Sequence, residues 1–101
     1  MVQAGVYSSV IHYLKAVDAA KTDDGTKVAA KMKELPTDDI LFGKGTVRAD
    51  GRKIQPAYLF QVKKPSESKG PYDYYKLIAT IPANEAFRPM SDGDCPLVSK
   101  K

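Results

Sequence analysis

The sequence has no tryptophan, and it has one cysteine (Cys95) and one histidine (His12) among 101 residues. A single cysteine excludes an internal disulfide and any metal site built from cysteines alone. No apolar run approaches the roughly 18 residues of a membrane-spanning helix, so no direct membrane insertion is expected. No signal peptide, a charged segment followed by an apolar one, opens the chain, which predicts a cytoplasmic location if it is expressed as it stands.

Basic residues outnumber acidic ones by 16 to 12, but they are scattered along the chain. A surface that binds phosphates needs clustered cations with aromatic or polar side chains between them. Here acidic residues interleave the basic ones throughout, so we expect no nucleic-acid partner and rank that function last. Apolar residues make up 43% and charged residues 28% of the chain, a balance typical of folded domains.

The first third of the sequence predicts two helices joined by a short turn. The first helix is expected over residues 5–20 and the second over residues 23–35, with Thr22 or Asp23 as the N-cap and Pro36 at the end. So short a turn predicts a helical hairpin. A wide apolar stripe on the first helix predicts burial against more than one neighbour, and it comprises Val6, Tyr7, Val10, Ile11, Tyr13, Leu14 and Val17.

From Phe42 onward the pattern changes to that of strands. Asp50-Gly51 lies between β-prone runs and predicts a hairpin over residues 46–63, because glycine accepts the positive φ of the turn. Pro56 is expected at the beginning of the second strand of this hairpin or on an unpaired edge.

A last strand is predicted over residues 74–81, and it is apolar on both alternations. Both of its faces are therefore expected to be covered. The remaining residues, 83–101, contain prolines and few apolar side chains to offset the entropy of ordering, which predicts an irregular tail. Residues 1–82 are predicted to form an α+β fold, in which the helical hairpin packs on a small antiparallel sheet of about three strands.

The candidate chemical groups form no recognisable catalytic or metal-binding motif. His12 has no Asp or Glu three or four residues away, and acid–base catalysis needs such a partner. Ser8 and Ser9 lack the glycine flanks of a nucleophile elbow. We therefore expect no enzyme, no catalytic residue, no metal and no cofactor. The other candidates are interpreted as capping or turn residues (Asp23, Asp24, Asp38, Asp39) and as a free thiol (Cys95).

Two strings carry a family resemblance. The first is AGVYSSVIHYLKAV at residues 4–17, followed by TDD at 22–24 and VAAKMK at 28–33. The second begins at Gly45 and includes the turn RADGR at 48–52 and the strand YLFQVK at 58–63. Together they resemble the C-terminal portion of a periplasmic solute-binding protein of the branched-chain amino acid ABC importer type, in the type I periplasmic binding protein family. The resemblance covers about the last quarter of a typical member.

The resemblance implies a fragment of a two-lobed receptor for the uptake of amino acids or small organic acids. The partners that it implies are a small-molecule ligand and a membrane permease, and the intact family is periplasmic. It places Tyr7 near the start of a helix whose N-terminal end approaches the ligand cleft, so Tyr7 is the one ligand-binding candidate; a place in the core is the competing interpretation. The residues by which the family grips the carboxylate and amine of a ligand have no counterpart in this chain, so ligand binding by the chain alone is not expected.

The main alternative is a free-standing small α+β module that self-associates or binds a protein partner. The apolar last strand and the wide helical stripe both predict uncovered apolar surface. We therefore expect self-association, as a homodimer or more weakly, that does not depend on Cys95.

Overall fold

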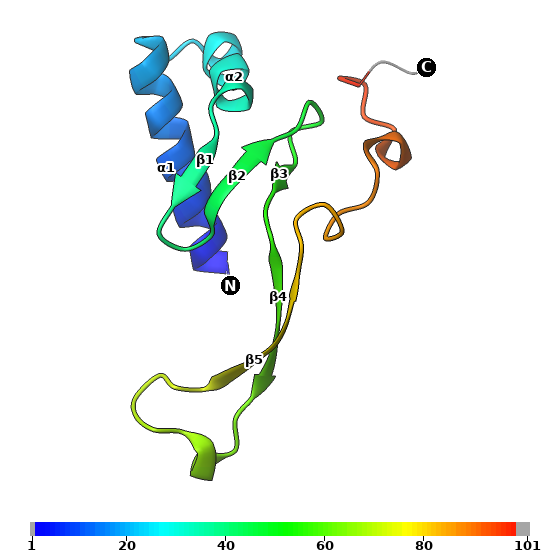
Figure 1. Cartoon of the computed structure of the whole chain (residues 1–101). Coiled ribbons are helices and arrows are strands. Elements are labelled where there is room, and N and C mark those ends of the chain that lie inside the picture. The colour runs from blue at the N-terminus through cyan, green and yellow to red at the C-terminus, as the bar shows by residue number, and fades with distance from the viewer. Residues whose placement is uncertain (1, 99–101) are drawn as a thin grey trace.

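The computed structural model describes residues 2–98 of the chain. Two helices, α1 (Val2–Ala20) and α2 (Gly25–Glu34), lie side by side (Figure 1). The elements that follow are β1 (Thr37–Asp39), β2 (Gly43–Val47), β3 (Lys53–Ile54), β4 (Ala57–Val62), the 3₁₀-helix η1 (Pro65–Glu67), β5 (Tyr75–Ile81) and the 3₁₀-helix η2 (Met90–Gly93).

α2 begins directly after Asp24, which is its N-cap. The Asp24 carboxylate accepts a hydrogen bond from the Lys27 N–H, with 3.0 Å between Oδ1 and N. Such a cap satisfies one of the free N–H groups in the first helical turn. The N-cap was predicted at Thr22 or Asp23, and that prediction was wrong, because α2 begins after Asp24. The Thr22 hydroxyl instead accepts a hydrogen bond from the Asp24 N–H at 3.2 Å.

The sheet beside the helix pair has three short antiparallel strands in the order β1–β2–β3. α1 contacts β1 and α2 contacts β2. The strands approach so closely at Gly45 that an added Cβ there would lie 2.5 Å from the Ile54 oxygen and 2.8 Å from Thr37 Oγ1. The predicted α+β class, with a helical hairpin on a small antiparallel sheet, is confirmed.

The turn between β2 and β3 lies at Asp50-Gly51. Gly51 has a φ of +83°, and its N–H donates to the Arg48 carbonyl at 2.9 Å. The hairpin differs from the one predicted over residues 46–63, because β3 has only two residues. Pro56 lacks the N–H that would continue the ladder, and the chain leaves this sheet before β4 begins. The predicted second strand is therefore divided between two sheets.

β4 and β5 pair with each other in a separate two-stranded antiparallel sheet, which we call the ribbon. The pairing shifts by one residue after Leu59, which lies opposite Ala79, so that Phe60 lies opposite Leu77. The ribbon projects away from the helix pair (Figure 1), and within residues 2–98 no helix and no strand of the other sheet packs against it. The cover predicted for both faces of the last strand is thus not supplied by this part of the chain.

The buried core is very small. Within the described part of the chain the buried apolar side chains are Ala16 and Val28, and the buried polar ones are Ser8, His12 and Thr37. The chain exposes 7883 Å² of accessible surface, whereas a compact monomer of 11.1 kDa exposes about 5,650 Å². Its Cα radius of gyration is 16.9 Å, against about 13 Å for a compact domain of 100 residues. The chain therefore carries about 2,200 Å² of surface that a compact fold of its size would cover.

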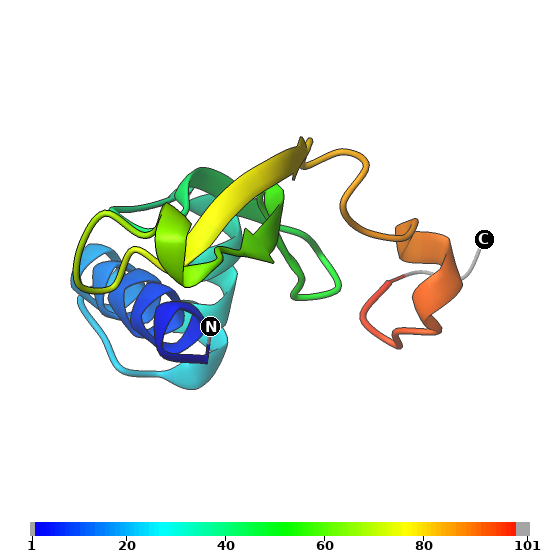
Figure 2. The same ribbon diagram turned by 90° about the horizontal axis from the view of Figure 1, so that it is seen from below.

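The tail follows the ribbon and stands apart from the helix pair (Figure 2). It contains a turn, in which the Glu85 N–H donates to the Pro82 carbonyl at 2.9 Å, and the short helix η2. It contacts the β2–β3 turn, because Arg48 Nη1 donates to the Arg88 carbonyl at 3.1 Å. Residues 99–101 of the predicted tail lie outside the described residues.

Candidate functional site

Tyr7, the one ligand-binding candidate, lies in the first half of α1. Its side chain is 42% exposed, so it is not a core residue among the elements that the structure describes. The ring borders an open hollow of about 520 Å³, which we call the Tyr7 hollow. The hollow is lined by Tyr7, Ile11 and Lys15 from α1, and by Asp38, Asp39 and Ile40 at β1.

The Tyr7 hollow combines apolar, cationic and anionic groups. Tyr7 and Ile11 form its apolar wall, and the Lys15 ammonium donates to the Asp38 carbonyl at 2.7 Å. The Asp38 residue is exposed. An apolar wall beside a few polar groups is typical of small-molecule sites, but such sites usually bury most of the ligand. All six lining residues come from α1 and the β1 region, so this hollow is one part of a site rather than an enclosed pocket.

A buried polar cluster lies beside the hollow and consists of Ser8, Asp39 and Lys53. The Ser8 hydroxyl donates to Asp39 Oδ2 at 2.6 Å. The Lys53 ammonium donates to the same oxygen at 3.1 Å and also to the Ser8 hydroxyl. The other carboxylate oxygen, Oδ1, accepts from the N–H groups of Leu41 and Phe42, each at 2.9 Å. We call these three side chains the Ser8–Asp39–Lys53 cluster.

The Asp39 carboxylate is charged in this cluster, although the Asp39 side chain is only 3% exposed. Burial alone raises the pKa of Asp39, because the charged form loses hydration. The hydrogen bonds from Ser8, the Phe42 N–H, Lys53 and the Leu41 N–H outweigh this effect and hold the pKa of Asp39 well below its usual range. Ser8 is 2% exposed, so its hydroxyl is closed to a substrate despite the lysine beside it. The cluster therefore fixes α1 against the sheet.

Sequence reasoning found only part of this cluster. The interpretation of Asp39 as a turn residue agrees with its bonds to two following N–H groups. Its contacts with Ser8 and Lys53 were missed, since these residues are 31 and 14 positions away in the sequence. No local spacing connects residues so far apart, so a single sequence carries no signal for the cluster.

His12 has a structural contact between the two helices. It is 5% exposed, and its ring Nε2–H donates to the Met32 carbonyl at 2.7 Å, which fixes the proton on Nε2. Within residues 2–98 no group of three or more His, Cys, Asp or Glu side chains is placed to hold a metal ion. No helix in the same part of the chain has the length and apolar character to span a membrane.

A second hollow, of about 650 Å³, lies between the β2–β3 turn and the tail. Arg48 lines it, but its guanidinium is engaged by the Asp50 carboxylate, at 3.1 and 2.7 Å, and by the Arg88 carbonyl. The hydrogen bond from Arg48 lowers the pKa of Asp50. Cys95 also lines this hollow and is half-buried. This hollow therefore lies at the contact between the tail and the β2–β3 turn.

The class of protein follows from comparison with known families. The model of the periplasmic binding protein family matches residues 1–71, so the chain belongs to this family. It is similar in structure to a periplasmic binding protein from Burkholderia mallei, with a TM-score of 0.84 and 50% identity, over 92% of this chain and 24% of that one. It is also similar to a branched-chain amino acid ABC transporter periplasmic ligand-binding protein from Burkholderia xenovorans LB400, with a TM-score of 0.85 and 43% identity, over 94% and 25% of the two chains.

No curated protein sequence gives a significant match. The chain spans about a quarter of the length of the two solved relatives. The predicted resemblance to solute-binding proteins of this type is confirmed.

Proposed function

We propose that this chain is a non-catalytic part of a periplasmic solute receptor that serves an ABC importer. The complete receptor binds a branched-chain amino acid or a related small organic acid and delivers it to a membrane permease. The observation that carries the proposal is the Tyr7 hollow, which is open and walled by α1, β1 and the residue after β1. The relative from Burkholderia xenovorans, described as a ligand-binding protein of branched-chain amino acid transport, supports the ligand class.

In this proposal Tyr7 and Ile11 form an apolar wall for the ligand side chain. The Ser8–Asp39–Lys53 cluster holds α1 against β1, and Ser8 is the residue next to Tyr7, so the cluster fixes the position of the helical turn that carries Tyr7. A small-molecule site buries 70–90% of its ligand, and a hollow with two neighbouring walls does not. The chain alone is therefore not ligand-competent, and binding requires the other walls of a complete receptor.

The test is a chimera in which this chain replaces the matching quarter of the Burkholderia xenovorans protein. Calorimetric titration with L-leucine, L-isoleucine and L-valine is expected to give binding by the chimera and none by the isolated chain. Tyr7→Ala is expected to weaken binding by the chimera about tenfold or more. Tyr13→Ala is the matched control, because Tyr13 is also 42% exposed on α1 but does not line the hollow.

Three results contradict the proposal. These are a chimera that binds none of the three ligands, equal losses in the Tyr7 and Tyr13 variants, and tight binding by the isolated monomer. The first would remove the receptor assignment, and the second would remove Tyr7 from the site. The third would show that this chain has a complete site of its own.

A second candidate is a free-standing module that self-associates as a homodimer. The open ribbon favours it, since Leu59, Phe60 and Leu77 are each about half exposed. Sedimentation of the isolated chain in reductant distinguishes the two. A tight homodimer that persists without ligand supports the module, whereas a strict monomer counts against it.

A further inference from the structure

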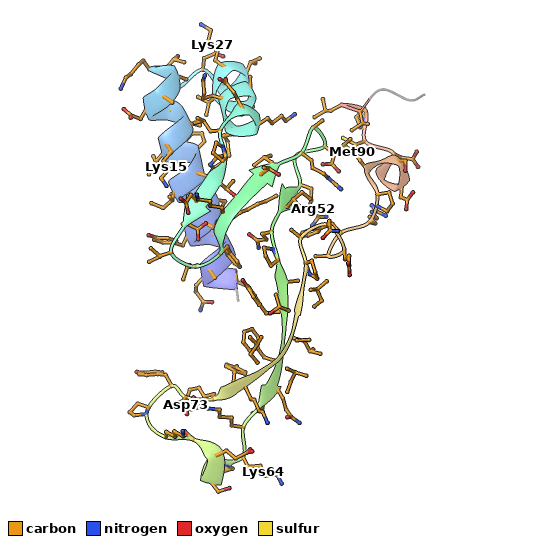
Figure 3. All side chains as sticks on the ribbon, in the orientation of Figure 1. Lys15, Lys27, Arg52, Lys64, Asp73 and Met90 are labelled. Carbon is orange, nitrogen blue, oxygen red and sulfur yellow. The ribbon has the colours of Figure 1, made fainter. Side chains whose placement is uncertain are left out.

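All three arginines of the chain, Arg48, Arg52 and Arg88, line the hollow between the β2–β3 turn and the tail, which we call the arginine hollow. Of the far more numerous lysines in residues 2–98, Lys53 alone lines it. Arg52 extends from the turn toward the tail segment that leads to Met90 (Figure 3). Arginine binds carboxylates and phosphates better than lysine does, because its planar guanidinium presents several N–H donors in a fixed geometry.

Two of the three guanidiniums have unused donors. Arg48 is engaged by the Asp50 carboxylate, at 3.1 and 2.7 Å, and by the Arg88 carbonyl at 3.1 Å. The Arg52 guanidinium lies over the Phe87 ring, 5.6 Å from its centre. Within residues 2–98 neither this guanidinium nor that of Arg88 donates a hydrogen bond. Both groups can therefore donate to a ligand in the hollow.

The lining of the arginine hollow carries a surplus of positive charge. Asp50 is its one carboxylate, and this carboxylate forms an ion pair with Arg48. Lys53 is already paired within the buried cluster described above. The unpaired charges of the lining are therefore those of Arg52 and Arg88, which match a ligand with two negative charges. The carboxylates of the tail do not line the hollow, and these are Glu85, Asp92 and Asp94.

The size and the apolar part of the hollow indicate an organic ligand. Its volume of about 650 Å³ falls within the range of small-molecule sites. Ala86, Phe87 and Pro89 give it an apolar wall beside the arginines. An inorganic anion would leave this wall in contact with water, whereas a short carbon skeleton would cover it.

We propose that the arginine hollow binds a small organic dianion, either a phosphate monoester or a dicarboxylate, between Arg52 of the turn and Arg88 of the tail. The two guanidiniums donate to the anionic oxygens, and the carbon skeleton lies on the apolar wall. Arg48 is a positioning residue, since its bond to the Arg88 carbonyl holds the tail beside the turn. The site shares no lining residue with the Tyr7 hollow, and it does not depend on the receptor assignment.

A ligand in this position connects the tail to the sheet. Two observable changes follow from that connection. The backbone amides near Arg88 become more ordered, because the ligand adds contacts between the tail and the turn. The Cys95 thiol, which lines the same hollow, becomes less accessible to reagents.

The experiment is a titration of the 101-residue chain with glycerol 3-phosphate and, separately, with succinate. The buffer contains no phosphate, and sodium chloride keeps the ionic strength constant. Saturable shifts of the amide signals of Gly51, Arg52 and Arg88 are expected, with a Kd of about 1 mM or tighter. Acetate carries one charge and is expected to bind at least about tenfold more weakly. The tighter of the two dianions identifies the source of the ligand.

Variants that keep the charge locate the site. Arg52→Lys and Arg88→Lys are each expected to weaken binding about fivefold or more, because lysine lacks the fork of donors. Lys44→Ala is the control for a general charge effect, since Lys44 is exposed on β2 and does not line the hollow. Its Kd is expected to stay within about twofold of the wild-type value. Circular dichroism of each variant shows whether the helices are intact.

A measurement on the wild-type chain supports the same site without any substitution. Alkylation of Cys95 by iodoacetamide is expected to slow about threefold or more at saturating dianion, because the bound ligand covers the thiol.

Four results overturn the proposal. These are shifts that do not saturate, acetate binding as tight as that of the dianions, equal losses in the arginine variants and Lys44→Ala, and an alkylation rate that the ligand does not change. None of them bears on binding of amino acids by the chimera, so the two proposals fail independently.

Discussion

Lys53 Nζ lies 3.1 Å from Asp39 Oδ2, and this ion pair joins the two outer strands of the three-stranded sheet. Asp39 ends β1 and Lys53 begins β3, while β2 lies between them. Ser8 adds a hydrogen bond from α1 to the same carboxylate oxygen. One buried carboxylate therefore connects a helix and both edges of the sheet, in a chain whose apolar core is very small.

Asp39→Asn is expected to destabilise the helix–sheet unit by about 1–3 kcal/mol, because the half-buried Lys53 ammonium loses its charged partner. The measurement is urea unfolding followed by far-UV circular dichroism. Asp38→Asn is the control, because the neighbouring Asp38 is exposed and its described contact is through the backbone carbonyl. Equal effects of the two substitutions would remove the cluster as a stabilising feature.

The same carboxylate predicts the acid sensitivity of the chain. The pKa of Asp39 is lower in the folded state than the usual 3.9 or so of the unfolded chain. The unfolded state therefore binds more protons, and stability from this group is present above about pH 4 and is lost as the pH falls through the folded pKa. Helical signal is expected to be level from pH 7 to about pH 5 and to decline below about pH 4.

The control for this pH profile is Asp39→Asn, in which the decline below about pH 4 should be shallower. The pKa values of Asp18 and Asp73 are also lowered, by the hydrogen bonds that they accept from Lys21 and Lys63. The Asp18–Lys21 pair lies on the surface, so added salt should weaken its contribution and leave that of Asp39. An identical pH profile in the variant would contradict the prediction.

Gly45→Ala tests the close approach of the three strands. An added Cβ would lie 2.5 Å from the Ile54 carbonyl oxygen and 2.8 Å from Thr37 Oγ1, so β1 and β3 must move apart. We expect the free energy of unfolding to fall by about 2 kcal/mol or more. Gly5→Ala is the matched control, because a Cβ at Gly5 has no atom within 4 Å. In the helix that change should stabilise by up to about 1 kcal/mol. Thermal unfolding of both variants should therefore shift in opposite directions.

The helix pair and the Asp50-Gly51 turn could be predicted because their signals are local. Periodicity and a glycine with positive φ act within a few residues. β1 was missed because its local sequence carries no strand signal. It is three residues long, and two of them are aspartates. The predicted hairpin divides between two sheets near Pro56, and where it divides depends on the sheet edge at which the chain leaves. The strand propensity of single residues does not specify that edge.

The orientation of α1 could not be predicted from its apolar stripe. The stripe was expected to be buried, whereas the polar residues Ser8 and His12 are inside. Their partners, Asp39 and Met32, are 31 and 20 residues away, so only the folded chain brings the donors and acceptors together. Within residues 2–98 the stripe residues Val6, Val10 and Leu14 are each about half exposed, so the predicted burial of the stripe is not supplied by this part of the chain.

The last prediction concerns the tail, which is attached to the sheet by few contacts. Arg48 donates to the Arg88 carbonyl at 3.1 Å, and the Arg52 guanidinium lies 5.6 Å from the centre of the Phe87 ring. A hydrogen bond and an exposed cation–π contact each contribute about 1 kcal/mol. Ordering the backbone costs about 1–2 kcal/mol for every residue.

We therefore expect amide order parameters below about 0.6 from Asn84 to Val98 in the isolated chain, against about 0.85 in α1. Phe87→Ala should lower the values around Arg88 further, because it removes the cation–π contact with Arg52. Tyr72→Ala, at an 85% exposed ring in the loop between β4 and β5, should leave the tail unchanged. Nitrogen-15 relaxation measures all three proteins, and tail values as high as those of α1 would show that the two contacts hold far more of the chain than their energies allow.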